Sequence, residues 1–172
     1  MTTIEYIRET LRTGEPRLLA LAEDMKDAPL TAPTPRGGNH PLWVMGHLAF
    51  AEARLLSYIE GGEQELAHWQ NLFAPGTEPS ADPSVYPSMD EVIAAFKSVR
   101  QRTMKLLGRL TDADLERPSH APPERRDFAG TIAKCLILIC SHPLIHIGQL
   151  ADARRAAGRE PLFNIKPAPK SN

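Results

Sequence analysis

Hydrophobic residues recur along this chain at the spacing of an α-helix, and no segment shows the alternation that is typical of a β-strand. The first apolar stripe consists of Ile4, Ile7, Leu11, Leu18, Ala22 and Met25. It keeps its phase across Pro16, so we expect one kinked helix there rather than two. The pattern predicts four amphipathic helices, over about residues 3–25, 39–59, 88–110 and 128–157.

The residues that flank these segments include typical helix-start and helix-stop signals. Asn39 is the predicted N-cap of the second helix, with Pro41 in its first turn and Gly61 after its end. Ser88-Met89-Asp90-Glu91 reads as a capping box for the third helix. Gly158 follows the last apolar position of the fourth helix and is its expected stop.

The connections between the predicted helices differ in length. Residues 62–87 are rich in proline and form the longest one, in which residues 68–73 could make a short helix. A second loop covers residues 111–127 and starts with a helical turn. The proline-rich tail after Gly158 is expected to wrap the surface or fray. Four helices with a long second crossover predict an all-α four-helix bundle that forms a single domain over residues 1–172.

Composition and charge narrow the classes of function. Apolar residues make up 42% of the 172 residues and the formal net charge is −1, so neither nucleic acid nor an anionic membrane is an expected partner. Cys135 and Cys140 lie in an apolar run, five residues apart, and are expected to be buried and reduced. The N-terminus shows no signal-peptide pattern, and the longest apolar run, Ile132 to Cys140, is short for a membrane span. We therefore expect a cytoplasmic protein.

Histidines on the apolar stripes are the main candidates for chemistry. His142 and His146 are four residues apart, which places both imidazoles on one face of the fourth helix. His47 lies on the inward stripe of the second helix. Burying imidazoles costs free energy unless their nitrogens find partners, and three of them could bind one divalent ion with a coordination position left open. The alternative is three separate core histidines, each satisfied by its own neighbours.

Several neighbours of these histidines allow two interpretations each. Pro143 either aims His142 at the ion or is a tolerated kink. Gln149 faces inward and either orients a ligand or bonds the backbone. His40 is expected at the rim or in a cap, and His68 and His120 are expected in solvent.

Further expectations concern packing. Gly46 and Gly148 should permit close helix packing, and Trp43 should lie in the core. Arg154, Arg155 and Arg159 should form a solvated helix end that complements the helix dipole, and the alternative is that they bind an anionic substrate.

Two segments together carry a resemblance to a known family. They are His40-Pro41-Leu42-Trp43-Val44-Met45-Gly46-His47-Leu48 and Ser141-His142-Pro143-Leu144-Ile145-His146-Ile147-Gly148-Gln149-Leu150. The chain thereby resembles the DinB family, also called the DinB/YfiT-like metalloenzymes, along nearly its whole length. Pro143 departs from the commoner pattern.

The resemblance implies an up-down-down-up four-helix bundle with a divalent ion, zinc or nickel, on His47, His142 and His146. It also implies a homodimer, for which Leu48, Leu55 and Leu138 supply apolar residues outside the main stripes. Some relatives resemble thiol-dependent S-transferases or a mycothiol-dependent isomerase, so a low-molecular-weight thiol is one expected partner.

Three hypotheses for function remain open at this point. The first is a thiol-dependent S-transferase that acts on small molecules, and the second is a metal-dependent hydrolase. No glutamate accompanies the histidine pair as a general base, which weakens a peptidase-like hydrolase. The third is a non-catalytic dimeric, stress-related protein that binds a metal or ligand. In the first two, substrate is expected to enter near residues 62–87, with Trp69 and Phe73 as a possible apolar wall.

Overall fold

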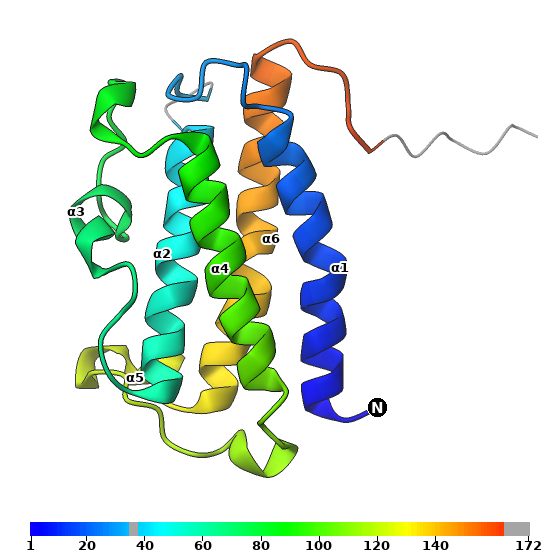
Figure 1. Ribbon diagram of the computed structural model, residues 1–172, viewed down its shortest axis with the longest axis vertical. Helices are drawn as coiled ribbons and strands as arrows, with labels where there is room; N and C mark the ends of the chain where they lie inside the picture. Colours follow the sequence, from blue (N-terminus) through cyan, green and yellow to red (C-terminus); the bar gives the residue numbers. More distant parts are fainter. Residues whose placement is uncertain (35–37, 164–172) are drawn as a thin grey trace, which may run out of the picture.

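The computed structural model describes residues 1–34 and 38–163 of the chain. The bundle consists of four long helices, which Figure 1 shows side by side and running up, down, down and up along the chain. They are α1 (Thr3–Glu23), α2 (Pro41–Glu60), α4 (Met89–Leu107) and α6 (Ile132–Ala156). In the described part of the chain there is no β-strand, only two isolated bridges. The predicted all-α four-helix bundle is confirmed.

The long crossover makes α2 and α4 point the same way, because it returns the chain to the end of the bundle where α2 began (Figure 1). α2 packs against α4 and α6, and α1 packs against α6 and α4. The first two helices in the sequence therefore lie on a diagonal, although they follow each other along the chain. One continuous apolar core joins all four helices.

Local signals set most helix boundaries. Pro16 lies inside α1 without breaking it, and the capping box at Ser88 is present with the Glu91 side chain bonded back to the backbone N–H of Ser88. The expected cap of α2 was wrong by one residue. His40 is the N-cap instead of Asn39, because its Nδ1 accepts the backbone N–H of Trp43 at 3.0 Å. An imidazole nitrogen here replaces the usual side-chain oxygen.

The start of the last helix was predicted four residues too early. α6 begins at Ile132, and the hydroxyl of Thr131 accepts the backbone N–H of Lys134 as its cap. Phe128 belongs to a separate short helix, α5 (Arg126–Ala129), and its side chain is 46% exposed. The apolar period continues through this region, but Thr131 caps a new helix and thereby separates the two.

The long crossover contains the expected short helix. A 3-10 turn at Ala67–Trp69 leads into α3 (Gln70–Phe73). The side chains of Trp69 and Phe73 are buried. Phe73 lies against Gly46 of α2, where a Cβ atom would overlap its ring. Gly46 therefore permits close packing as predicted, whereas a Cβ on Gly148 would meet nothing. The tail after Gly158 was expected to wrap the surface or fray. Its residues from 164 on lie outside the part of the chain that the structure describes.

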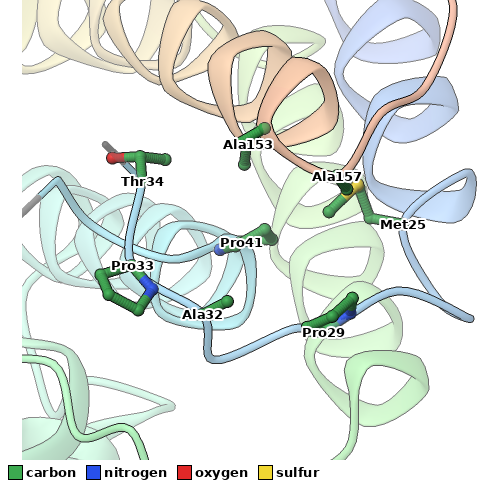
Figure 2. Close-up of a pocket in the computed structure, with 9 residues that line it drawn as sticks. Met25, Pro29, Ala32, Pro33, Thr34, Pro41, Ala153 and Ala157 are labelled. Atoms are coloured by element: carbon green, nitrogen blue, oxygen red, sulfur yellow. The ribbon is translucent and has the colours of Figure 1, made fainter.

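Charged groups at the end of the bundle are less solvated than expected. Arg154 is buried, and its Nε donates to the Asp24 carboxylate at 2.8 Å, which joins the end of α6 to the end of α1. Arg155 remains exposed, as predicted. A small cavity of about 140 Å³ lies at the same end, beside Pro29, Pro41 and Ala153 (Figure 2). Among the described residues, its lining contains no ionisable side chain.

One face of α6 is apolar and exposed. The side chains of Ile137, Leu144 and Ile145 are 60%, 59% and 66% exposed. By length and composition α6 could cross a membrane, although His142 and His146 face α2 within the bundle. The residues expected to supply a dimer contact lie elsewhere: Leu48 and Leu55 are buried, and Leu138 packs against the core.

Candidate metal centre

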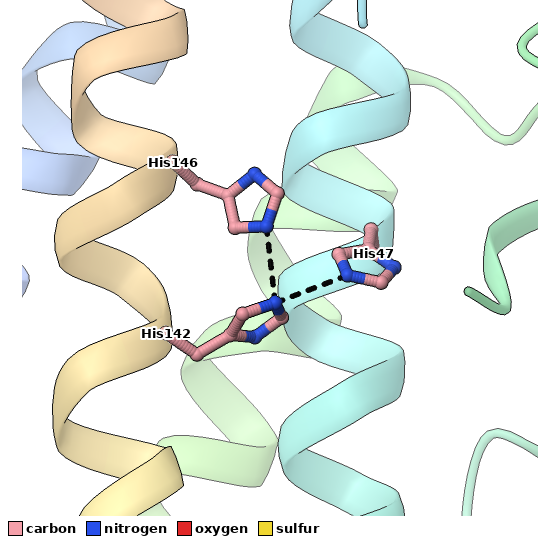
Figure 3. A group of neighbouring side chains, drawn as sticks. All are labelled: His47, His142 and His146. Atoms are coloured by element: carbon pink, nitrogen blue, oxygen red, sulfur yellow. Dashed lines mark hydrogen bonds between the residues drawn. The ribbon is translucent and has the colours of Figure 1, made fainter. Parts of the chain in front are cut away.

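The three predicted histidines meet between α2 and α6. Figure 3 shows His142 and His146 on α6 turned toward His47 on α2. The Nε2 atom of His142 lies 3.2 Å from that of His47 and 3.0 Å from that of His146. One ligand atom from each ring falls within 4.8 Å of the other two. The inward helical positions read from the sequence therefore correspond to one cluster in space.

His47 is held on two sides. Its Nδ1 lies 2.7 Å from the carbonyl oxygen of Phe73, to which it donates a hydrogen bond. The Trp43 ring stacks on the imidazole, with centroids 4.5 Å apart and planes 10° from parallel. Trp43 lies in the core, as expected, and its contact with a candidate ligand was not foreseen. The hydrogen bond to Phe73 places the proton on Nδ1 and leaves Nε2 as an acceptor, while the stack on Trp43 restricts the ring plane.

His146 is oriented by a residue of its own helix. Its Nδ1 lies 2.8 Å from Oε1 of Gln149, three residues further along α6. The amide oxygen accepts the Nδ1 proton, so the Nε2 lone pair of His146 points at the cluster. Of the two interpretations of Gln149, the geometry agrees with the one in which its side chain orients His146 rather than bonding the backbone.

The hydrogen-bond count within the cluster does not balance without a further group. Nε2 of His47 and Nε2 of His146 are both acceptors, and His142 can offer at most one proton to them. At least one lone pair is then unsatisfied in a half-buried site, which costs free energy. Nitrogen ligands about 2.1 Å from a tetrahedral ion lie roughly 3.4 Å apart, close to the separations observed. The donor set therefore fits a divalent ion.

Burial and mutual repulsion keep these rings neutral. Burial lowers the pKa of His47 to about 4, with a smaller contribution from the positive charge of His146. Burial also lowers the pKa of His142 to about 3, and the other two histidines add to this. The pKa of His146 is lowered by burial as well. Neutral imidazole is the form that binds metals, so at neutral pH no proton has to leave first.

The other residues singled out from the sequence are a proline, three further histidines and two cysteines. α6 continues without a break through Pro143, between the two histidines. His40 caps α2 and is buried, and one of its ring nitrogens lies 3.0 Å from the Ser80 carbonyl oxygen. His68 and His120 are exposed, as predicted. Cys135 and Cys140 are free thiols, and burial raises the pKa of each to about 11.

A cavity of about 240 Å³ opens beside the cluster, and His47 and His142 form part of its wall. Trp69 and Phe73 do not line it, since both pack into the core. The crossover contributes Pro75 to its lining, and the segment before α6 contributes Arg125 and Phe128. Its polar members Arg54, Tyr58 and Arg125 were not expected from the sequence. Arg54 had a signal, because it stands one heptad after His47 in a largely apolar helix.

Comparisons with known proteins agree with this fold. The structure of YfiT from Bacillus subtilis superposes with a TM-score of 0.61 at 23% sequence identity, over 91% of this chain and 89% of that one. YfiT is described as a probable metal-dependent hydrolase with an unusual four-helix bundle topology. No curated protein matches the sequence.

The amino-acid sequence gives stronger evidence of family membership than the structural similarity does. Residues 10–150 match the DinB superfamily, a span that contains all three histidines and most of the four-helix bundle. Since this match covers most of the 172 residues, the chain belongs to the DinB superfamily.

Proposed function

We propose that this protein is a metal-dependent enzyme that holds one divalent ion, zinc or nickel, on His47, His142 and His146 and acts on a small molecule. The observation that carries the proposal is the convergence of the three Nε2 atoms, two of which have no proton. The description of YfiT as a probable metal-dependent hydrolase supports the same class of chemistry.

The reaction that these surroundings favour is the transfer of a small thiol. A bound divalent ion lowers the pKa of a thiol or of water and so supplies a nucleophile near neutral pH. The cavity lining contains no carboxylate that could act as a general base. A free thiol ionises near pH 8.5 and free water near 15.7, so the ion has to lower the pKa of a thiol much less than that of water.

The protein's own thiols do not supply this nucleophile. Burial raises the pKa of both cysteines, so neither forms a thiolate readily at neutral pH. Cys135 also donates a hydrogen bond to the Ala129 carbonyl oxygen, away from the histidines. We therefore propose a thiol-dependent S-transferase in which the thiol enters as a low-molecular-weight cosubstrate.

Hydrolysis is the second candidate, because YfiT has the same fold and is described as a probable hydrolase. It would use the same three histidines, with water in place of the thiol. A non-catalytic protein that binds a metal or ligand is the third hypothesis, and only a search for turnover separates it from the other two.

Elemental analysis and activity screens test the proposal. Protein reconstituted with zinc or nickel should hold about one ion per chain, and His146→Ala should lose it while the bundle stays folded. His68→Ala, which removes an exposed histidine, should bind the ion like the wild type. Absence of metal from the reconstituted wild type would refute the proposed site.

The same preparations separate the three functions. Thiol-dependent turnover of electrophilic acceptors indicates a transferase, and turnover of esters or amides without thiol indicates a hydrolase. Metal-loaded protein that turns over neither panel would instead support the non-catalytic hypothesis.

A further inference from the structure

The cavity beside the histidines contains two arginines whose charge no carboxylate offsets. Arg54 on α2 and Arg125 just before α5 both line it. Several other half-buried or buried arginines pair with acidic groups, as Arg100 does with Glu52 and Arg159 with Asp24. Within residues 1–34 and 38–163, neither Arg54 nor Arg125 forms a salt bridge, so their charges are available to a ligand.

The two guanidinium groups act on each other and on the histidines. Burial lowers the pKa of Arg54, and the positive charge of Arg125 lowers it further. The charge of Arg54 also contributes to the lowered pKa of His47 and of His142. Arg54 therefore lies close enough to the candidate ligands for its charge to matter there.

A divalent ion on three neutral imidazoles would add two further positive charges to this cavity. Such a concentration of like charge in a partly desolvated space is unfavourable unless an anion joins it. The site thus favours a substrate that carries negative charge. Guanidinium groups bind carboxylates through charge-assisted, often paired, hydrogen bonds.

The remaining residues of the cavity lining indicate that the part of the ligand away from its charged group is apolar. Ala51, Leu55, Pro75, Phe128 and Leu138 form apolar walls. Phe128 is exposed in the bundle as a whole, yet it borders this cavity. The volume of about 240 Å³ is below the range of roughly 300–1,000 Å³ that is usual for drug-sized ligands. A small molecule with a compact apolar body fits these dimensions.

We propose that the substrate, or the thiol cosubstrate, is a small carboxylate with an apolar body, whose carboxylate group is bound by Arg54 and Arg125 while its reactive end faces the histidines. This inference rests on the proposed function for the position of the reactive end. The anion site itself depends only on residues that do not bind the metal.

Binding of a matched pair of probes tests the proposal. Phenylacetate and its neutral amide, phenylacetamide, have nearly the same shape and differ in charge. Calorimetric titration of zinc-loaded wild type should show tighter binding of phenylacetate. Arg54→Met and Arg125→Met should each weaken phenylacetate binding by about tenfold or more, since a hydrogen bond to a charged group is lost, and should leave phenylacetamide unchanged.

Three controls make the outcome decisive. Arg17→Met removes an exposed positive charge on α1 and should not alter either affinity. Circular dichroism shows whether each variant is folded, and because Arg54 and Arg125 lie on different segments, one variant suffices if the other unfolds. Inorganic phosphate serves as a competing oxyanion without an apolar body.

The outcomes distinguish this inference from the proposed function. Equal binding of the two probes by zinc-loaded wild type would overturn the inference, and so would a preference for phenylacetate that survives in both arginine variants, because the metal would then be the anion site. Tighter binding of phosphate than of phenylacetate would overturn the carboxylate assignment. If the protein fails to hold zinc but still prefers phenylacetate in an arginine-dependent manner, the anion site stands and the proposed function fails.

Discussion

Two of the three candidate ligands, His47 and His146, each have a neighbour that fixes which ring nitrogen carries the proton. The Phe73 carbonyl oxygen does this for His47, and Oε1 of Gln149 does it for His146. The effect is to aim two lone pairs at one point before any ion arrives. Partners of this kind commonly change metal affinity by about 10- to 100-fold when they are removed.

We predict that Gln149→Leu lowers zinc affinity by roughly 10- to 100-fold without unfolding the bundle. The leucine cannot accept the Nδ1 proton of His146, so the ring can rotate or adopt the other tautomer. Competition with a chromophoric chelator measures the change. Gln101→Leu, on the exposed face of α4, is the matched control and should retain wild-type affinity. Equal affinities in all three proteins would show that Gln149 does not orient the ligand.

The lowered pKa values predict how pH acts on the metal-free protein. The unfolded chain titrates its histidines near 6.5, whereas the folded protein holds the pKa of His47 at about 4 and that of His142 at about 3. Between these limits the unfolded chain binds more protons. The contribution of these two histidines to stability is therefore complete above pH 6.5 and is lost as the pH falls toward 3.

Urea unfolding in the presence of a chelator, at pH 7 and pH 5, measures this effect. His142→Gln should lose less stability than the wild type on going to pH 5, and His68→Gln should lose as much as the wild type. A pH dependence unchanged in His142→Gln would contradict the assignment.

Contacts between helices hold the hydrogen bonds around the histidines in place. α3 is a helix of four residues in the long crossover, yet it delivers the carbonyl oxygen that orients His47. It can do so because Gly46 lets the Phe73 ring lie directly against α2. The orientation of His47 in the candidate metal centre therefore depends on how α3 packs against α2.

We predict that Gly46→Ala destabilises the protein by about 1–3 kcal/mol and weakens zinc binding, because the added methyl group displaces Phe73. Gly14→Ala on α1 is the control, since its Cβ meets no other atom, and it should stabilise the protein by about 0.5–1 kcal/mol. Urea unfolding and chelator competition give the two readouts. Wild-type stability of Gly46→Ala would mean that α3 can shift at no cost.

The contact between α2 and α4 contains a buried ion pair. Two nitrogens of Arg100 donate to the two carboxylate oxygens of Glu52 at 2.8 and 2.7 Å, and Thr103 donates to the same carboxylate at 2.6 Å. Both charged side chains are nearly inaccessible to solvent. The apolar stripes alone do not predict this pair, because its members lie 48 residues apart.

Arg100→Met should cost about 3–5 kcal/mol, because it leaves the Glu52 carboxylate buried without its partner. Arg102→Met removes an exposed arginine that pairs with Glu60 and Glu65, and it should cost at most about 1 kcal/mol. The double variant Glu52→Leu/Arg100→Met should be more stable than Arg100→Met. Chemical unfolding of the four proteins checks this order, and a loss of less than 1 kcal/mol in Arg100→Met would contradict it.

At the scale of the whole molecule, the exposed apolar face of α6 is a candidate protein–protein contact, because burying it against a partner would remove apolar surface from water. Ile137, Leu144 and Ile145 are exposed, with Lys134 and Asp152 toward the two ends of the same face. Two copies that pack antiparallel along this face would bring Lys134 of one near Asp152 of the other. We propose this face, rather than Leu48, Leu55 and Leu138, as the contact of the expected homodimer.

Light scattering across the micromolar range should give twice the mass of one chain, and Ile145→Glu should give a monomer. Tyr6→Glu, which changes an exposed aromatic residue on α1, should remain a dimer. A monomeric wild type would refute the dimer, and a dimeric Ile145→Glu would place the contact elsewhere. The cytoplasmic location stays a prediction that these measurements do not address.

The sequence by itself determined the helices, their order and the histidine set, because these features depend on short-range periodicity and on capping residues. The spacing of His142 and His146 on one helix face is of this kind, and so is the capping box at Ser88. Errors arose where a local signal competed with another, as at Asn39 and His40, or at Phe128, where Thr131 starts a new helix.

Only the tertiary structure decided what surrounds the histidines. The contact of Phe73 with His47 joins residues that lie 26 apart in the sequence. The cavity combines Arg54 of α2 with Arg125 and Phe128 of a connection whose path no period predicts. Burial, proton placement and local charge depend on neighbours in space, and a linear pattern does not contain those neighbours.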